Sequence, residues 1–333
     1  MPTFAVLGSG GWGTALAIVL AQKANTHVRL WSARPERARH LRETRENVAQ
    51  LPGIPIPANV EVTADVDVAT RGADCWIVAV PTAYLRINAL RWKPHAHADL
   101  PVISLTKGIE GETFQRPTRI LADVLGVHRL VALSGPSHAE EVARGLPTSI
   151  VAASTDGELA AWVQRHVGGD RLRIYTNADV IGVEIAGALK NVLGIAAGIC
   201  DGLGFGDSAK AALLTRGLVE IQRFGVAFGA DPGTFMGLAG VGDLITTCFS
   251  QHGRNRRVGE RLARGESFAA VTAGPQVAEG VNTARSVYER ITRAGLEAPI
   301  MTGVYRVLYE NAAPLTVAHA LLDRPQKVER QEG

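Results

Sequence analysis

The sequence predicts an α/β domain with a doubly wound, mostly parallel sheet, followed by an all-α domain. A chain of 333 residues is longer than one hydrophobic core usually accommodates, which favours two domains. In the first half, short apolar β-rich runs alternate with helical patterns, which is typical of a parallel sheet covered by helices. After about Ala178 only helical patterns recur. We therefore place the domain boundary near Asp179, giving domains of residues 1–179 and 180–333.

Several apolar runs of the first half are apolar on both faces, as interior strands of a parallel sheet are. The expected strands are Thr3–Leu7, Val28–Trp31, Cys75–Val80, Val102–Leu105, Leu130–Ser134 and Ser149–Ala153. The second half carries apolar residues at helical spacing. The expected helices are Val180–Cys200, Ser208–Phe228, Asn255–Arg264, Thr283–Ala294 and Ile300–Tyr309.

A glycine-rich loop follows the first expected strand and precedes an expected helix, Thr14–Gln22. It reads Gly8-Ser9-Gly10-Gly11-Trp12-Gly13, which is the pattern G-x-G-x-x-G. In a Rossmann domain the first glycine allows the tight turn, the second lets the backbone approach a pyrophosphate, and the third lets helix and strand pack closely. Free N–H groups at the helix start then face the phosphates. The loop in this context predicts a dinucleotide site.

The end of the second strand bears on the choice between NAD and NADP. NAD-specific enzymes usually place an acidic residue there, on the ribose 2′-hydroxyl. This chain instead reads Ser32-Ala33-Arg34-Pro35. An arginine without an acid suits a 2′-phosphate, so we expect NADP to be accepted at least as well as NAD. The alternative is that Arg34 is an exposed arginine at a strand end.

Lys190 is the only formal charge between Glu184 and Asp201, in a stretch that is apolar on all sides. Such a helix is expected to be buried, and a buried ammonium is costly unless it is paired or gives up its proton. Desolvation lowers a lysine pKa, as a general acid/base acting near neutral pH requires. We therefore predict that Lys190 is catalytic. The alternatives are that Lys190 reaches the surface or pairs with a carboxylate such as Glu184.

Lys107 follows the expected strand Val102–Leu105, and Ser134-Gly135-Pro136-Ser137-His138-Ala139 follows the next one. The carboxyl ends of parallel strands form the edge where open α/β sheets bind ligands. Both segments are therefore candidates for the site.

Two further segments lie in the second half. Gly240-Val241-Gly242-Asp243 is expected to be a glycine-rich turn, and Arg254-Asn255-Arg256-Arg257 a helix start. Asparagine, arginine and free helix N–H groups together suit a phosphate. A solvated basic face is the alternative interpretation of the arginines.

Composition and motifs exclude several classes of function. The 35 basic and 32 acidic residues give a net charge of +3, which does not suggest nucleic-acid binding. The three cysteines show no metal-ligand or disulfide spacing, so no metal site is predicted and a reducing cytoplasmic setting fits best. Lys190 interrupts the most apolar stretch, so no membrane-spanning segment is expected. Motifs for nucleotide hydrolysis and hydrolase chemistry are absent from the sequence.

Taken together, the motifs resemble those of the bacterial NAD(P)-dependent glycerol-3-phosphate dehydrogenases, in the same order and over nearly the whole chain. The blocks that carry the resemblance are Gly8–Ala17, Thr106–Glu110, Ser134–Ser137, Gly187–Asn191, Asp201–Gly206, Gly240–Asp243, Arg254–Arg257 and Val277–Gly280. The resemblance implies reversible reduction of dihydroxyacetone phosphate to sn-glycerol 3-phosphate, which supplies the backbone of membrane phospholipids.

The same resemblance implies a role for individual residues. Lys190 is the acid/base residue, and the substrate site comprises Lys107, Gly135, Ser137, Lys190, Asp243, Arg254 and Asn255. The cofactor is lined by Gly11, Trp12, Arg34, Lys107, Ala139, Arg254, Val277 and Glu279, beside the glycines at 8, 10 and 13. Gly253 stands where relatives often have serine, which puts one side-chain contact in doubt. Ala33 stands where relatives often have a polar or basic residue, which leaves Arg34 as the expected 2′-phosphate ligand.

Two alternatives to this function remain open on the sequence. One is a related two-domain dehydrogenase acting on a hydroxycarboxylate or on ketopantoate. The other is a non-catalytic NADP-binding sensor that kept the dinucleotide loop. A homodimer formed through the helical domain is an arrangement that the sequence allows.

Overall fold

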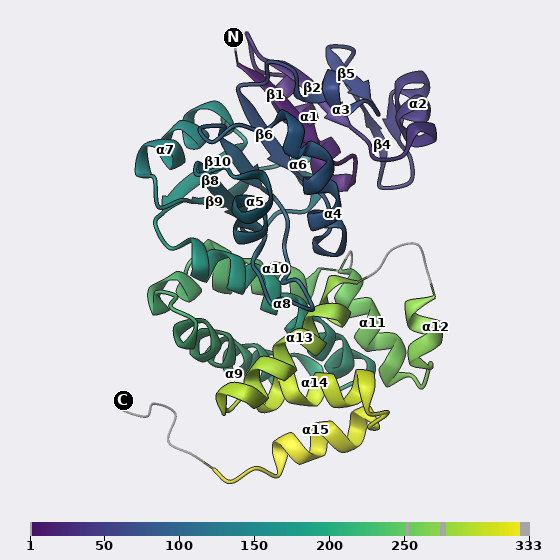
Figure 1. Cartoon of the computed structure of the whole chain (residues 1–333). Coiled ribbons are helices and arrows are strands. Elements are labelled where there is room, and N and C mark those ends of the chain that lie inside the picture. The colour runs from purple at the N-terminus through teal and green to yellow at the C-terminus, as the bar shows by residue number, and fades with distance from the viewer. Residues whose placement is uncertain (1, 251–252, 274–277, 327–333) are drawn as a thin grey trace.

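The computed structural model describes residues 2–250, 253–273 and 278–326. Figure 1 shows the sheet and its helices in one half of the molecule and a group of helices in the other. The strands are β1 (Thr3–Leu7), β2 (His27–Trp31), β3 (Glu46–Asn47), β4 (Leu51–Pro55), β5 (Val60–Thr63), β6 (Cys75–Val78), β7 (Val102–Ser104), β8 (Leu130–Ser134), β9 (Thr148–Ala153) and β10 (Leu172–Asn177).

Helices connect these strands and make up the rest of the chain. In the first half they are α1 (Gly11–Ala21), α2 (Pro35–Thr44), α3 (Val66–Thr70), α4 (Thr82–Trp92), the 3-10 turn η1 (Lys93–His95), α5 (Pro117–Leu125), α6 (Ala139–Ala143) and α7 (Gly157–His166). In the second half they are α8 (Val180–Gly202), α9 (Gly206–Ala227), η2 (Pro232–Met236), η3 (Leu238–Gly242), α10 (Asp243–Phe249), α11 (Arg254–Ala263), α12 (Phe268–Thr272), α13 (Glu279–Ala294), α14 (Pro299–Tyr309) and α15 (Pro314–Leu322).

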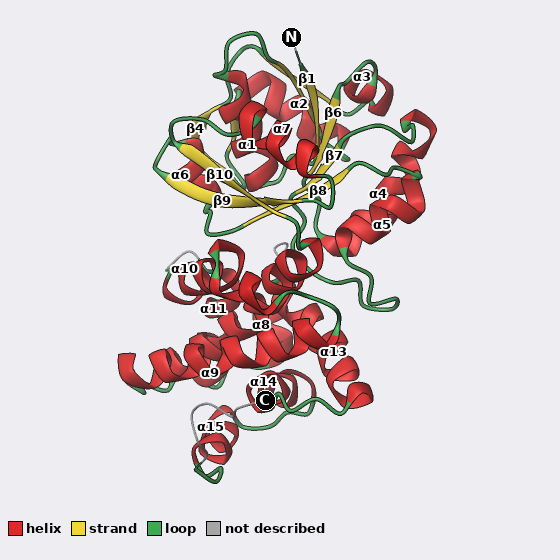
Figure 2. Ribbon diagram, turned by 90° about the vertical axis from the view of Figure 1, so that its left-hand side faces the viewer, coloured by secondary structure: helices red, strands yellow, loops and turns green. Residues whose placement is uncertain are grey.

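The eight-stranded sheet has the order β10-β9-β8-β7-β6-β1-β2-β5, and its neighbouring strands are parallel except β8 and β9. Along β1, side chains alternate between the two faces: Phe4 and Val6 join the core under α1 and α7, whereas Ala5 and Leu7 join the core under α4 and α5. Figure 2 shows helices on both sides of the sheet. The predicted fold class, a doubly wound and mostly parallel sheet followed by helices, is confirmed.

All six expected strands are present; two have the expected bounds, and the other four differ at one end by one or two residues. The sequence analysis missed β5 and β10, which are the two outermost strands of the sheet. In β10 buried and exposed residues alternate at first, and the last three residues are not buried, so the strand lacks the continuous apolar run of the interior strands. The short β3–β4 hairpin, α10, α12 and α15 were also not predicted.

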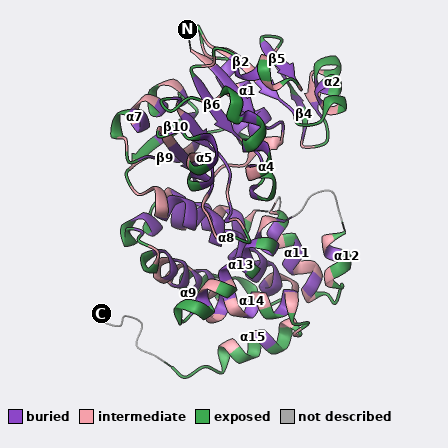
Figure 3. Cartoon of the chain, in the orientation of Figure 1, coloured by how far each residue is buried: buried purple, intermediate pink, exposed green. Residues whose placement is uncertain are grey.

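Helix α8 is the core of the second half. Every residue from Gly182 to Cys200 is buried, and α9, α10, α11, α13 and α14 pack around it. Figure 3 shows α8 as the most continuously buried segment of this half. By length and composition α8 could span a membrane, but 89% of its apolar window is buried inside the fold. The apolar composition is therefore explained by its central position.

Close contact between α8 and α11 requires glycine on both helices. A Cβ on Gly198 would lie 1.9 Å from the carbonyl oxygen of Arg256, and a Cβ on Gly259 would lie 2.0 Å from that of Ile195. Real Cβ atoms do not approach so closely, so the two backbones meet because neither position carries a side chain. This contact fixes α11 beside the C-terminal half of α8.

Candidate active site

The glycine loop between β1 and α1 has the geometry of a dinucleotide cradle. Gly8 has φ +134°, and a Cβ there would lie 2.5 Å from the carbonyl oxygen of Ala79. A Cβ on Gly13 would lie 1.9 Å from the carbonyl oxygen of Gly8, so only glycine lets α1 start this close to the strand. A Cβ on Gly10, in contrast, would meet nothing nearer than 4.0 Å, which leaves room for a phosphate.

The first turn of α1 is available to an anion. Gly10 is its N-cap, no side chain caps it, and no acidic residue lies in the first turn. The helix begins at Gly11, three residues earlier than expected, so Trp12 and Gly13 already belong to it. Ala139 at the start of α6 lies beside the loop, because a Cβ on Gly11 would be 3.5 Å from its Cβ. These residues fit the pyrophosphate of NAD or NADP.

The far side of the site is a cluster of two lysines around one aspartate. Asp243 lies at the start of α10 and is 1% exposed. Its Oδ1 accepts a hydrogen bond from Lys190 Nζ at 2.5 Å, and its Oδ2 accepts one from Lys107 Nζ at 2.8 Å. Lys190 also donates to the Thr247 hydroxyl at 2.8 Å, and Lys107 to the carbonyl oxygen of Gly135 at 3.0 Å. The three charged side chains thus form one unit, in which Lys190 and Asp243 are buried and Lys107 is partly buried.

Topology brings this unit to the sheet edge that carries the glycine loop. The strands β1, β6, β7 and β8 are parallel, so the segments after them meet at one edge. The glycine loop follows β1, Lys107 follows β7, and Gly135 follows β8. Helix α8 crosses below this edge, where a Cβ on Gly187 would lie 2.9 Å from Ser134 Oγ. Lys190 is one turn further along α8.

Burial and neighbouring charges shift the pKa values of Lys190 and Asp243. Burial lowers the pKa of Lys190 to about 8, with the charge of Lys107 acting in the same direction and that of Asp243 opposing. Burial alone would raise the pKa of Asp243, but the two ammonium groups outweigh it and hold this pKa below its ordinary value. Asp243 is therefore ionised at neutral pH, while Lys190 can both hold and release a proton near pH 8.

Of the two alternatives for Lys190, a position at the surface is wrong, and pairing with a carboxylate is right in kind but wrong in the partner named. Its side chain does not reach the surface, since Lys190 is 7% exposed. Nor does it pair with Glu184, whose carboxylate instead accepts hydrogen bonds from Arg116 and from the backbone N–H and hydroxyl of Thr118. The carboxylate that does pair with Lys190 is 53 residues away in the chain.

The start of α11 forms a third wall. Asn255 is buried; its Nδ2 donates to Asn191 Oδ1 at 2.9 Å, and its Oδ1 accepts from the backbone N–H of Gly280 at 2.9 Å. Arg254, the first residue of the helix, is exposed. Burial raises the pKa of Glu279 at the start of α13, against the charges of Arg254, Lys190 and Lys107. Glu279 and these three cations are thus close enough to interact.

Several details differ from the sequence analysis. Gly240–Gly242 lie in the π-helical turn η3, not in an open glycine turn, and this turn leads directly into α10. The Ser137 hydroxyl donates to the carbonyl oxygen of Gly135 at 2.9 Å. Of the arginine cluster, Arg256 pairs with Asp201 at 2.5 Å and with Glu260 at 2.8 Å. Val277 lies outside the described residues.

Sequence reasoning missed two polar residues of the cluster, Thr247 and Asn191. Thr247 lies four residues after Asp243 on α10, so both face the same side of the helix. Asn191 follows Lys190 directly and fixes Asn255. Helical spacing from Asp243 would have indicated Thr247, but the contact of Asn191 with α11 required the structure.

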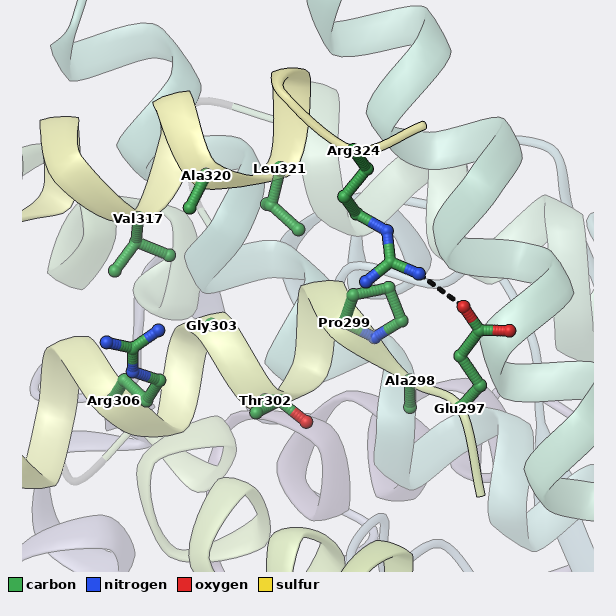
Figure 4. Close-up of a pocket in the computed structure, with 10 residues that line it drawn as sticks. All are labelled: Glu297, Ala298, Pro299, Thr302, Gly303, Arg306, Val317, Ala320, Leu321 and Arg324. Carbon is green, nitrogen blue, oxygen red and sulfur yellow. Dashed lines mark hydrogen bonds and ion pairs between the residues drawn. The ribbon is translucent and has the colours of Figure 1, made fainter. Parts of the chain in front are cut away.

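Two further observations delimit the site. A cavity of about 310 Å³ between α14, α15 and the segment before α14 contains an ion pair of Arg324 and Glu297 (Figure 4). None of its lining residues is among the predicted site residues. Among the described residues, no three His, Cys, Asp or Glu side chains gather as a metal site.

Comparison with known proteins places the chain in a family. Residues 3–160 match the family model for the N-terminus of NAD-dependent glycerol-3-phosphate dehydrogenase, and residues 179–319 match the model for its C-terminus. The chain belongs to the NAD-dependent glycerol-3-phosphate dehydrogenase family. The resemblance inferred from the motifs is thereby confirmed.

Individual members of the glycerol-3-phosphate dehydrogenase family match along their whole length. An NAD(P)+ glycerol-3-phosphate dehydrogenase of Salinibacter ruber is 46% identical over 333 residues, covering 99% of this chain and 97% of that protein. The crystal structure of glycerol-3-phosphate dehydrogenase from Coxiella burnetii superposes with a TM-score of 0.92 at 36% identity, covering 97% of this chain and 99% of that one.

A ketopantoate reductase from Ralstonia eutropha also superposes, with a TM-score of 0.61 at 17% identity, covering 95% of this chain and 100% of that one. That likeness concerns the fold alone and gives no support to the ketopantoate alternative.

Proposed function

We propose that this protein is an NAD(P)-dependent sn-glycerol-3-phosphate dehydrogenase. It reduces dihydroxyacetone phosphate to sn-glycerol 3-phosphate, catalyses the reverse oxidation, and supplies the backbone of glycerophospholipids. One observation carries the proposal: Lys190, with a pKa of about 8, is buried against Asp243 at the sheet edge that also holds the glycine loop. Relatives that are 43–47% identical bear the same enzyme name.

In this proposal the reacting carbon lies between the glycine-loop side of the site and Lys190. The bound dinucleotide supplies the hydride in reduction and accepts it in oxidation. Lys190 Nζ donates its proton to the carbonyl oxygen of the substrate as the alcohol forms, so charge does not accumulate in a dry site. Asp243 holds the ammonium groups of Lys190 and Lys107 in place, and Lys107 assists the substrate.

The phosphate of the substrate is held at the start of α11. Arg254 and the backbone N–H groups there provide charge and hydrogen bonds, and the buried Asn255 shapes the wall. Binding the phosphate away from the reacting carbon fixes the orientation of that carbon. Gly135 and Ser137 complete the substrate site.

Residues 8–13 would hold the cofactor, and Arg34, Lys107, Ala139, Arg254 and Glu279 would line it. NADP is accepted at least as well as NAD, because Arg34 takes the place of an acidic residue at the end of β2. Residues 1–179 form the cofactor domain and residues 180–333 the substrate domain. The proposal includes a cytoplasmic location. It also includes formation of a homodimer through the helical half, and sedimentation would measure that oligomeric state.

The decisive test is the rate of NADPH oxidation with dihydroxyacetone phosphate, compared with ketopantoate and with the keto acids of hydroxycarboxylates. We expect turnover with the phosphorylated triose alone. Turnover with a keto acid in place of the triose would support the carboxylate-substrate alternative. Dinucleotide binding without turnover on any of these substrates would support the non-catalytic sensor.

A further inference from the structure

The segment after β2 carries a second arginine that the motifs do not indicate. Arg34 is the N-cap of α2, and Arg37 lies in the first turn of the same helix. The two residues are three positions apart at the start of one helix, so their side chains lie on the same side of it. Burial and, in addition, the positive charge of Arg34 lower the pKa of Arg37. Among the described residues, no carboxylate forms an ion pair with either of them. The end of β2 therefore holds a pair of cations without a counterion.

Arg37 is also fixed in direction, unlike the other arginines of α2. Its Nη2 donates to Asn47 Oδ1 at 3.1 Å. Asn47 is 2% exposed, and its Nδ2 donates to the carbonyl oxygen of Ser9 at 3.1 Å and to the Thr14 hydroxyl at 2.7 Å. One buried side chain thus connects Arg37 to the glycine loop.

The remaining arginines of this helix provide the contrast. Arg39 and Arg42 are exposed, and no ion pair or side-chain hydrogen bond is recorded for them in the part of the chain that the structure describes. Holding an arginine in one direction costs side-chain entropy. Among the arginines within α2, only Arg37, which lies next to Arg34 and the loop, has its direction fixed by such a bond.

We propose that Arg37 is a second ligand of the 2′-phosphate of NADP and, together with Arg34, sets the preference for NADP over NAD. The inference rests on the proposed NAD(P)-dependent activity. In a Rossmann domain the ribose 2′ position lies at the end of the second strand, which is where both arginines stand. A phosphate between them receives charge-assisted hydrogen bonds and relieves their mutual repulsion. NAD carries a 2′-hydroxyl there and gains neither effect.

The test measures the affinity of the whole protein for NADP+ and for NAD+ by calorimetry, without substrate. The variant Arg37→Gln removes the charge but keeps an amide donor for Asn47. A hydrogen bond to a charged group is worth about 1.5–3 kcal/mol, so we expect NADP+ to bind roughly tenfold to a hundredfold more weakly. The affinity for NAD+ should stay unchanged. Arg39→Gln, which removes an exposed charge from the same helix, should change neither.

A purely structural role of Arg37 predicts a different result, since disturbing Asn47 and the glycine loop weakens both dinucleotides alike. Equal losses for NADP+ and NAD+, or no loss for either, would therefore overturn the inference while leaving the proposed function intact. Wild-type protein that binds neither dinucleotide would instead overturn the proposed function, and this inference with it. The double variant Arg34→Ala/Arg37→Gln should lose all preference for NADP+.

Discussion

The helical half buries two lysines, and their surroundings differ in charge balance. Lys210 donates to both carboxylate oxygens of Asp201, at 3.0 and 2.8 Å. Arg256 shares Asp201 and also pairs with Glu260, so two cations meet two anions. Lys190 and Lys107, in contrast, share Asp243 alone; no other carboxylate in the described residues forms an ion pair with either lysine.

The difference separates a structural cluster from a chemical one. A partly buried cluster whose charges balance needs no further ligand, and this one connects α8, α9 and α11. Lys190, Lys107 and the nearby Arg254 outnumber Asp243 and Glu279 by one positive charge, so this cluster is incomplete on its own and suits an anionic substrate or cofactor. Burial of a lysine therefore does not by itself identify the active site. The excess positive charge around the lysine is what identifies the active site. Four predictions test this distinction between a structural and a chemical cluster.

The largest effect is expected for Lys190→Ala. Loss of a positioned proton donor should lower kcat by about 10²–10⁴-fold. The fold should persist, because Asp243 keeps its hydrogen bond from Lys107. Steady-state kinetics with a dinucleotide-binding control would check this, and near-normal turnover would remove Lys190 from the chemistry.

Lys210→Met should lower stability and leave kcat almost unchanged, which is the opposite of the result expected for Lys190→Ala. Removing one partner of a buried pair costs about 3–5 kcal/mol, and both the remaining bond from Arg256 and the partial exposure of Asp201 place the loss at the lower end. The free energy of unfolding in urea should fall accordingly, while kcat per folded molecule stays close to that of the wild type. A selective loss of kcat with unchanged stability would contradict the structural assignment of this cluster.

Within the arginines of α11, Arg254→Ala should raise KM for dihydroxyacetone phosphate far more than Arg257→Ala. Both side chains are exposed, so the pair controls for loss of surface charge. A charge-assisted hydrogen bond of about 1.5–3 kcal/mol corresponds to roughly a tenfold to hundredfold change. Equal KM values in the two variants would show that the phosphate is bound elsewhere.

The smallest effect concerns pH. Reduction requires protonated Lys190, so kcat for reduction should fall as the pH rises through about 8. Oxidation requires the neutral amine, so kcat for oxidation should rise over the same range. The negative charge of Asp243 raises the pKa of Lys190, so Asp243→Asn should lower that pKa. The pH at which each kcat changes should then move to a lower value. Profiles of kcat against pH would measure this. If the pH at which kcat changes stays the same in this variant, a group other than Lys190 titrates.

The sequence indicated the interior strands and the core helix because burial leaves a local signal. β1, β6 and α8 are apolar in continuous runs, and Lys190 is conspicuous only because its neighbours are apolar. The outer strands β5 and β10 face solvent on one side and carry no such run. Sequence patterns therefore detect burial more readily than they detect pairing at a sheet edge.

By itself the sequence determined the dinucleotide loop, the fold class and the candidate lysines, since each depends on residues that are close together in the chain. Only the tertiary structure decided which carboxylate forms an ion pair with each buried lysine. Lys190 meets Asp243 instead of Glu184, which lies on its own helix, and Arg37 meets Asn47 beside the loop. Charge compensation depends on distances of a few ångströms between elements far apart in sequence, and those distances are set by packing.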